Sequence, residues 1–255
     1  MNESVIKLFK GWRPKVVFWD MWMTLGMSHC REPIGEAQQI LSPDVLPVGA
    51  NRHPIPTGAF LRFCLTNPTN DVEIFAHEAS TTFGWDLDSE RLSSFRVLIG
   101  KEKNCIALFP EVDDLLNFVQ SLGFDQGIIS NLWSFPSERL FSDTVLSRYF
   151  NPRDIVCSYD VRHAKPEKEI FEEACRRFNV RPDECLMVGD NLSADIKGAL
   201  AFGMKAALID RQMNVDPQEL VRLADDGYPP VLYMTNLNEL RNYLALCPAS
   251  SEWRP

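Results

Sequence analysis

From residue 16 to residue 25 the chain runs VVFWDMWMTL, an apolar stretch followed at once by an acidic residue. The apolar residues predict a buried strand over residues 15–19. Asp20 then lies at the end of that strand, where burying a carboxylate costs free energy unless the group is paired or has a chemical task. We therefore interpret Asp20 as a candidate nucleophile.

Three later segments carry polar residues in comparable positions. Ser130 and Asn131 follow one short apolar run, and Asp190 follows another after a glycine. Lys165 precedes a proline at the start of a predicted helix, and Asp195 comes about one helical turn after Asp190. In chain order these residues supply a nucleophile, a hydroxyl with an amide, an ammonium and a pair of carboxylates.

Beyond residue 106 the sequence alternates between short apolar runs and amphipathic stretches. The predicted strands cover residues 127–130, 155–157, 185–188, 206–209 and 231–234. The predicted helices cover residues 110–122, 136–148, 166–178, 193–202 and 236–246. Strands separated by helices of about ten to fifteen residues predict an α/β fold with a parallel sheet covered on both faces. Ligand sites of such sheets lie at the carboxyl ends of the strands, where Asp20, Ser130 and Asp190 all fall.

The segment 26–105 has a different pattern. Its first half is rich in proline, at positions 33, 43, 47, 54, 56 and 68. Helical patterns follow over residues 71–83 and 88–102, with Asp71 placed to cap the first of them. The segment is therefore predicted to be mostly helical and separate from the sheet.

Composition excludes several classes of function. The 255-residue chain has a net charge of −9 and no block of five or more basic residues, so a nucleic-acid partner is not expected. No apolar run approaches the roughly 18 residues of a membrane span, and residues 1–10 lack the apolar core of a secretion signal. The seven cysteines form no CxxC pair, so we expect reduced thiols in the cytoplasm and no zinc site. The oligomeric state stays open.

Together these motifs resemble the haloacid dehalogenase-like (HAD) superfamily, most of whose members are phosphatases. The resemblance covers residues 14–25 and 108–210. It implies a Rossmann-like core with a parallel sheet and an inserted helical cap. The expected domains are an α/β core over residues 1–25 and 106–255 and a cap over residues 26–105.

The resemblance also implies roles for the acidic residues. Asp20 matches the aspartate that attacks phosphorus and becomes an aspartyl-phosphate. Mg²⁺ is the implied cofactor, with Asp20, the backbone carbonyl of Trp22 and Asp190 as ligands. Asp195 would bind a metal-bound water or orient Lys165, although a first-turn acid that complements the helix dipole is the alternative interpretation.

The remaining motif residues are expected to handle phosphate. Ser130 and Asn131 would hydrogen-bond the transferring phosphoryl oxygens, although Ser-Asn after a strand is also ordinary turn chemistry. Lys165 would supply a point charge, and Thr24 would hydrogen-bond near the nucleophile. His163 is expected in a surface loop. The segment 26–105 also contains arginines that could hold an anionic substrate: Arg31, Arg52, Arg62 and Arg96.

Trp22 departs from the phosphatase pattern, which has a second aspartate at that position as acid and base. Indole has no titratable proton near neutral pH, and loss of a general acid costs about 10²–10⁴-fold in rate. The dehalogenase branch has tyrosine there but lacks the metal ligand that corresponds to Asp190. The leading hypothesis is a Mg²⁺-dependent phosphatase for a small phosphorylated metabolite. The alternatives are a dehalogenase-like hydrolase and a non-catalytic HAD-like binding protein.

Overall fold

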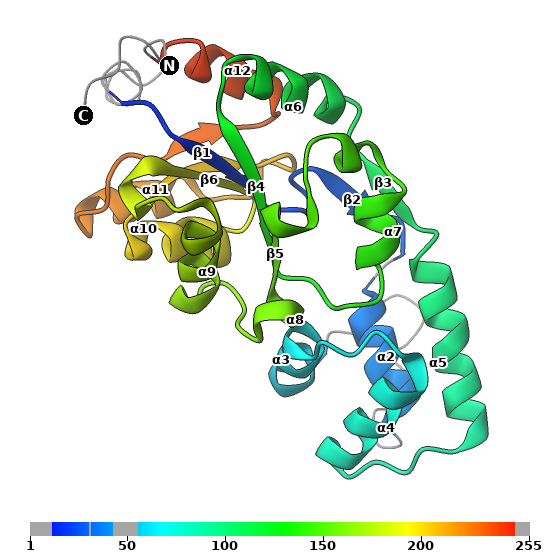
Figure 1. Ribbon diagram of the computed structural model, residues 1–255. Coiled ribbons are helices and arrows are strands. Elements are labelled where there is room, and N and C mark those ends of the chain that lie inside the picture. The colour runs from blue at the N-terminus through cyan, green and yellow to red at the C-terminus, as the bar shows by residue number, and fades with distance from the viewer. Residues whose placement is uncertain (1–11, 31, 43–55, 248–255) are drawn as a thin grey trace.

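The computed structural model describes residues 12–30, 32–42 and 56–247 (Figure 1). A six-stranded sheet forms its centre, and each strand of this sheet runs parallel to its neighbours. In spatial order the strands are β5 (Ile155–Cys157), β4 (Asp125–Ser130), β1 (Val16–Trp19), β6 (Cys185–Gly189), β7 (Lys205–Ile209) and β8 (Leu232–Met234). The predicted parallel α/β sheet is therefore confirmed.

Strand β1 lies inside this sheet and is buried along its whole length. Trp19 is in register with Ile128 of β4 on one side and Val188 of β6 on the other. A parallel strand covered on both faces needs apolar residues at successive positions, which explains the unbroken apolar run. Because β1 lies between β4 and β6, the carboxyl ends of these strands meet at one edge of the sheet.

Helices cover both faces of the sheet (Figure 1). Helices α6 and α12 share one apolar cluster with Val17 and Trp19, whereas α9 shares another with Val16 and Phe18. The α-helices of this part are α6 (Val112–Ser121), α7 (Ser137–Ser142), α8 (Ser158–Val161), α9 (Lys168–Phe178), α10 (Gly198–Phe202), α11 (Pro217–Asp225) and α12 (Asn238–Leu244). Across the described ranges, no helix combines the length and the apolar character that crossing a membrane requires.

Two predicted helices take a different form. The helix expected over 136–148 ends at α7 and resumes as a 3-10 turn, because the Thr144 hydroxyl donates to the Leu140 carbonyl and accepts from the Leu146 backbone N–H. The helix expected over 193–202 starts as a π-helical turn before α10. The short turns are η1 (Val145–Arg148), η2 (Pro152–Asp154), η3 (Pro182–Glu184) and the π-turn η4 (Leu192–Lys197).

Four helices form a separate group, here called the helical unit, beside the sheet in Figure 1. Its helices are α2 (Pro33–Leu41), α3 (Gly58–Thr66), α4 (Val72–Phe83) and α5 (Ser89–Glu102). The helices predicted over 71–83 and 88–102 are confirmed, with the side chains of Asp71 and Asp88 capping their first turns. In its described residues, the segment 26–105 adds no strand to the six-stranded sheet.

The core of the helical unit is aromatic and continues into the loop after β4. The ring of Phe75 lies 5.7 Å from that of Phe95 and 5.0 Å from that of Phe135, between centroids. Trp133 belongs to the same cluster and is almost completely buried. The loop that carries Asn131 is therefore packed directly against the helical unit.

A second sheet, absent from our sequence prediction, joins the two ends of the segment 26–105. Strand β2 (Gly26–Ser28) pairs antiparallel with β3 (Ile106–Leu108), and a disulfide links Cys30 to Cys105 beside this pair, with their Cα atoms 5.6 Å apart. The prediction that all cysteines are reduced is wrong for these two, because the strand pairing brings distant residues together. The remaining cysteines are free thiols: Cys64, Cys157, Cys175, Cys185 and Cys247.

Candidate active site

Three carboxylates converge at the carboxyl edge of the sheet. Asp20 follows β1 directly, Asp190 follows the neighbouring strand β6, and Asp195 lies in the π-turn η4. One carboxylate oxygen from each lies within 4.8 Å of the other two. Residues far apart in the sequence are thus brought to one point, as the strand order requires.

Lys165 is the cationic centre of this group. Its Nζ lies 2.6 Å from Asp20 Oδ1 and 2.6 Å from Asp195 Oδ1, and it donates to the Ile129 carbonyl at 2.7 Å. The side chain is only 1% exposed. Two of its three donors form hydrogen bonds, to Asp20 and to the Ile129 carbonyl, and the contact with Asp195 is an ion pair. Burial alone would lower the pKa of Lys165, but the carboxylates of Asp195 and Asp20 outweigh burial and raise it.

The site carries more negative than positive charge. Burial raises the pKa of Asp20 to about 6, although the ammonium of Lys165 opposes that rise. Burial, reinforced by the charges of Asp20 and Asp195, raises the pKa of Asp190 to about 8. Three carboxylates around one ammonium form a hard oxygen donor set that still lacks one or more positive charges. These residues therefore fit a divalent cation that prefers oxygen ligands.

A glycine at the end of β6 makes room for Asp195. A Cβ built on Gly189 would lie 2.4 Å from the Asp195 carboxyl carbon, closer than real Cβ atoms approach. The Asn191 backbone N–H donates to Asp195 Oδ2 at 2.9 Å. The π-turn and the missing side chain together hold the Asp195 carboxylate against the strand end, beside Lys165.

Ser130 and Asn131 occupy different positions in the site. Ser130 is fully buried at the end of β4, and its hydroxyl has no hydrogen-bond partner among the described residues. The Asn131 side chain holds the Lys165 backbone, donating to its carbonyl at 2.9 Å and accepting from its N–H at 2.7 Å. Asn131 thus positions Lys165, and its contact with a phosphoryl group stays a prediction.

Arg211 fixes the loop that follows the nucleophile and was missed in the sequence. Its guanidinium donates to the backbone carbonyls of Met23 and Thr24 at 3.0 and 2.8 Å and pairs with Glu111 at 2.7 Å. The Thr24 hydroxyl is buried and has no hydrogen-bond partner in the described structure. Arg211 comes just after the predicted strand 206–209, a position at the carboxyl edge that could have identified it.

Of the four predicted anion-binding arginines, the two that the structure describes, Arg62 and Arg96, pair with glutamates. Arg31 and Arg52 lie outside the described residues. Arg96 is engaged by Glu73 on the surface, and Arg62 by Glu167. His163 also contacts two glutamates on this surface, Glu167 and Glu169.

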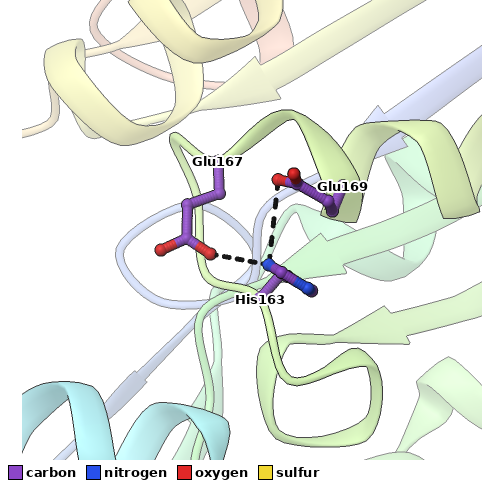
Figure 2. Close-up of side chains that lie close together, drawn as sticks. All are labelled: His163, Glu167 and Glu169. Atoms are coloured by element: carbon purple, nitrogen blue, oxygen red, sulfur yellow. Dashed lines mark hydrogen bonds and ion pairs between the residues drawn. The ribbon is translucent and has the colours of Figure 1, made fainter.

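Figure 2 shows His163 in its surface loop between two glutamates, as expected from the sequence. Its Nδ1 lies 2.9 Å from Glu167 and 3.7 Å from Glu169, and the side chain is 42% exposed. Glu167 also binds Arg62 of α3, which ties the loop before α9 to the helical unit.

A cavity of about 530 Å³ lies between loops at the carboxyl edge of the sheet and the helical unit. Its walls include Trp22 from the loop after Asp20, residues 131–133 from the loop after β4, Leu61 of α3 and Glu102 of α5. Trp22 and Asn131 belong both to this cavity and to the loops that follow β1 and β4, so the cavity adjoins the loops of the carboxylate site, although the carboxylates themselves do not line it.

The parallel sheet and its edge of three carboxylates and a lysine define a class of hydrolases. Residues 15–203 match the haloacid dehalogenase-like hydrolase family, and the chain belongs to this family. The resemblance inferred from the motifs is thereby confirmed.

Several proteins of known name are similar to this chain. The glyceraldehyde 3-phosphate phosphatase of Methanothermobacter thermautotrophicus is 32% identical over 105 residues, which are 41% of this chain and 46% of that protein. The phosphoserine phosphatase of Thermus thermophilus is 28% identical over 131 residues, 51% of each chain. The chain thus spans about half the length of these curated relatives.

A solved structure matches over much more of the chain. The 2-haloacid dehalogenase of Pseudomonas syringae pv. Tomato DC3000 has a TM-score of 0.59 and 25% identity, covering 91% of this chain and 98% of that one. The similarity therefore includes the helical unit as well as the sheet.

Proposed function

We propose that this chain is a Mg²⁺-dependent phosphatase that hydrolyses a small phosphorylated metabolite through an aspartyl-phosphate on Asp20. The observation that carries the proposal is the cluster of Asp20, Asp190 and Asp195 around the buried Lys165. The phosphatase relatives agree with it. A nucleophilic carboxylate and an oxygen-rich cation site are the two parts that this reaction needs.

Asp20 is the proposed nucleophile. With its pKa near 6 it is ionised at neutral pH, and Lys165 keeps one of its oxygens fixed. A carboxylate oxygen forms a bond to phosphorus while the bond to the ester oxygen breaks, leaving the electron pair on the departing oxygen. Water then attacks phosphorus, the bond between phosphorus and the Asp20 oxygen breaks, and the proton that water loses passes to solvent or to the departed alkoxide, so that inorganic phosphate leaves and the carboxylate is restored.

The remaining site residues bind and position. Asp20, Asp190 and the backbone carbonyl of Trp22 would hold Mg²⁺, with Asp195 binding a metal-bound water or orienting Lys165. When bound, Mg²⁺ offsets the repulsion between the carboxylate and the phosphate. The unpartnered hydroxyls of Ser130 and Thr24 are proposed to donate to phosphoryl oxygens. Asn131 completes the set by holding Lys165.

Trp22 limits which phosphates react well. Its indole cannot give a proton to the departing oxygen, so esters of ordinary alcohols should react slowly. Acyl phosphates need less protonation and should react faster. Trp22 also favours the two alternatives. A dehalogenase-like hydrolase would not need an acid at this position, because a departing halide needs no proton. A non-catalytic binding protein would not need one because it performs no reaction.

We further propose that the helical unit is a cap domain over residues 26–105 on a core of residues 1–25 and 106–255. Its own aromatic core and the paired strands at its two ends support this division. Separate expression of the core, with a short linker between residues 28 and 106, tests it. Trp133→Ser and Phe135→Ser are included in this core, because the helical unit covers these two side chains. A folded core that binds Mg²⁺ then supports the division, and a core that does not fold contradicts it.

A cytoplasmic location is also proposed. The free cysteines agree with a reducing compartment, whereas the disulfide between Cys30 and Cys105 is typical of an oxidising one. Alkylation of thiols in intact cells, followed by mass spectrometry, decides between them. Free Cys30 and Cys105 in the native compartment would support the cytoplasm.

The decisive experiment for function is a substrate panel of acyl, sugar and p-nitrophenyl phosphates, run with Mg²⁺ and with EDTA beside a 2-haloacid. Phosphate release that needs Mg²⁺ and is abolished by Asp20→Asn supports the proposal, because an amide is a poor nucleophile. Halide release without Mg²⁺ would favour the dehalogenase. No turnover of any compound by the folded protein would favour the binding protein.

A further inference from the structure

The cavity beside Trp22 is acidic as well as apolar. The described residues that line it include two acids, Glu32 and Glu102, and no lysine, arginine or histidine. Most of the other walls are apolar or aromatic: Trp22, Met27, Ile34, Leu61, Leu65 and Trp133. A phosphate ester that places its phosphate at the carboxylate site would put the rest of the molecule against this surface.

Glu102 is the unusual member of this lining. It ends α5, is only 3% exposed, and accepts a hydrogen bond from the Trp133 indole at 2.8 Å through Oε1. Its second oxygen, Oε2, has no hydrogen-bond partner in the described structure. Glu102 also forms no ion pair with any described side chain. Buried carboxyl groups are normally paired, so this group lacks a counter-charge that a ligand can bring.

We propose that this cavity binds the amine-bearing end of a phosphate monoester, with the ligand ammonium donating to Glu102. The inference rests on the proposed phosphatase function and names the substrate class of that same site. An N–H-bearing ammonium supplies both the missing donor for Oε2 and the missing positive charge. The aromatic ring of Trp22 on the same cavity favours a cation further. Glu102 is then the residue that determines specificity.

The charge distribution of the two neighbouring sites supports this assignment. An additional phosphate or carboxylate on the substrate would face Glu102 and Glu32, and none of the described lining residues is cationic. A wholly apolar group would bury Glu102 further and leave Oε2 unpaired. An ammonium group avoids both problems, because it carries no negative charge and donates a hydrogen bond to Oε2. The alkyl chain that bears it fits the apolar walls.

Binding of matched ligands tests the inference. Aminoalkyl phosphates of increasing chain length are titrated calorimetrically into the folded Asp20→Asn variant with Mg²⁺, each against the alkyl phosphate in which a methyl group replaces the ammonium. At the fitting length the amine should bind about tenfold or more tightly, the usual effect of a hydrogen bond to a charged group. Equal affinities, or a preference for the alkyl phosphate, would overturn the inference.

Substitution of Glu102 tests whether this residue recognises the ligand ammonium. Glu102→Gln, made in the same background, keeps an oxygen for Trp133 and should bring both ligands to the same affinity. Glu32→Gln removes the same charge from an exposed position of the same cavity and should change the preference less than about twofold. If Glu102→Gln does not fold, Trp22→Leu replaces it, and loss of about threefold or more of the amine preference is expected. A preference that survives the folded variants would exclude this binding mode.

These results are separate from the test of catalysis. Turnover of alkyl and aminoalkyl phosphates at equal efficiency would retain the phosphatase and reject the amine specificity. A Glu102-dependent amine preference in a protein that hydrolyses no phosphate would reject the phosphatase and retain the amine site.

Discussion

The carboxyl edge of the sheet and the cavity of the helical unit both bury carboxyl groups, but they surround them with different partners. At the edge, Asp20 and Asp195 share the ammonium of Lys165, which stabilises their charge. In the helical unit, Glu102 has only an indole N–H, and burial raises its pKa to about 8. The first arrangement leaves Asp20, with its pKa near 6, ionised at neutral pH, whereas the pKa of the neighbouring Asp190 is raised to about 8 and a bound cation would favour its charged form. The second keeps a carboxyl group uncharged until a partner arrives.

Of the substitutions considered, removal of Lys165 should have the largest effect on stability and turnover, because it takes away the cation that the carboxylates at the edge share. In Lys165→Met, Asp20 and Asp195 stay buried without their cation, which should cost about 3–5 kcal/mol of stability and about 10³-fold or more in turnover. Denaturant unfolding and phosphatase kinetics measure the two effects. Lys15→Met is the control, because Lys15 is half exposed in its pair with Glu184 and should matter by about 1 kcal/mol or less. Equal effects of the two substitutions would contradict the assignment.

An acid at position 22 should raise turnover at the carboxyl edge of the sheet. Trp22→Asp adds a carboxyl that can protonate the departing oxygen, and we expect a gain of up to about 10²-fold on p-nitrophenyl and sugar phosphates. The gain should be smaller on acyl phosphates. Steady-state kinetics of both substrate types measures it. A folded, Mg²⁺-binding variant that is no faster on any phosphate would show that proton donation does not limit the site.

Glycine substitutions should distinguish the crowded end of β6 from the exposed face of α5. In Gly189→Ala the new methyl group displaces the Asp195 carboxylate, so about tenfold weaker Mg²⁺ binding and about 1–3 kcal/mol of destabilisation are expected. Gly100→Ala lies within α5 with nothing within 4 Å of its new Cβ, and it should stabilise by up to about 1 kcal/mol. Calorimetric Mg²⁺ titration and thermal unfolding measure both. Unchanged Mg²⁺ affinity in Gly189→Ala would mean that Asp195 does not contribute to Mg²⁺ binding.

The pH dependence of the unfolding free energy should reveal the protonation state of Glu102 in the folded protein. Its folded pKa near 8 lies above the ordinary value of 4.5, so the folded protein retains a proton that the unfolded chain has lost. The stabilisation is complete below about pH 4.5 and declines, by roughly 1 kcal/mol per pH unit, as pH rises through 8. The difference in unfolding free energy between wild type and Glu102→Gln should therefore fall over this range. A flat difference would mean that Glu102 is ionised or solvated.

Local sequence patterns predicted the sheet and the convergence of Asp20, Lys165 and Asp190 at its edge. Each of Asp20, Lys165 and Asp190 sits in a short segment whose residue order already signals a strand end or a helix start. The parallel arrangement then brings those ends together, so the convergence needs no knowledge of individual side chains. The helical caps Asp71 and Asp88 are likewise local contacts.

Features that depend on distant packing were missed. Strands β2 and β3 have only three residues each and no alternation, so nothing local distinguishes them from a turn. The pattern of α5 predicts a helix, but only the folded chain shows that Glu102 meets Trp133 from another loop. Position 211 follows a strand, yet the two carbonyls that Arg211 binds come from the opposite end of the sequence.

The pairing of β2 with β3 has a mechanical consequence. The helical unit leaves and rejoins the sheet through two hydrogen-bonded strands that the Cys30–Cys105 bond also joins, so both covalent connections form one narrow ribbon. A body attached in this way bends easily about an axis across the ribbon and resists twisting about its length. Trp133 and Phe135 belong to the loop after β4 but are buried in the unit, so a rotation of the unit about this ribbon would have to separate their rings from those of Phe75 and Phe95. The same loop carries Asn131, whose side chain holds the Lys165 backbone, so such a rotation would act on the position of Lys165 as well.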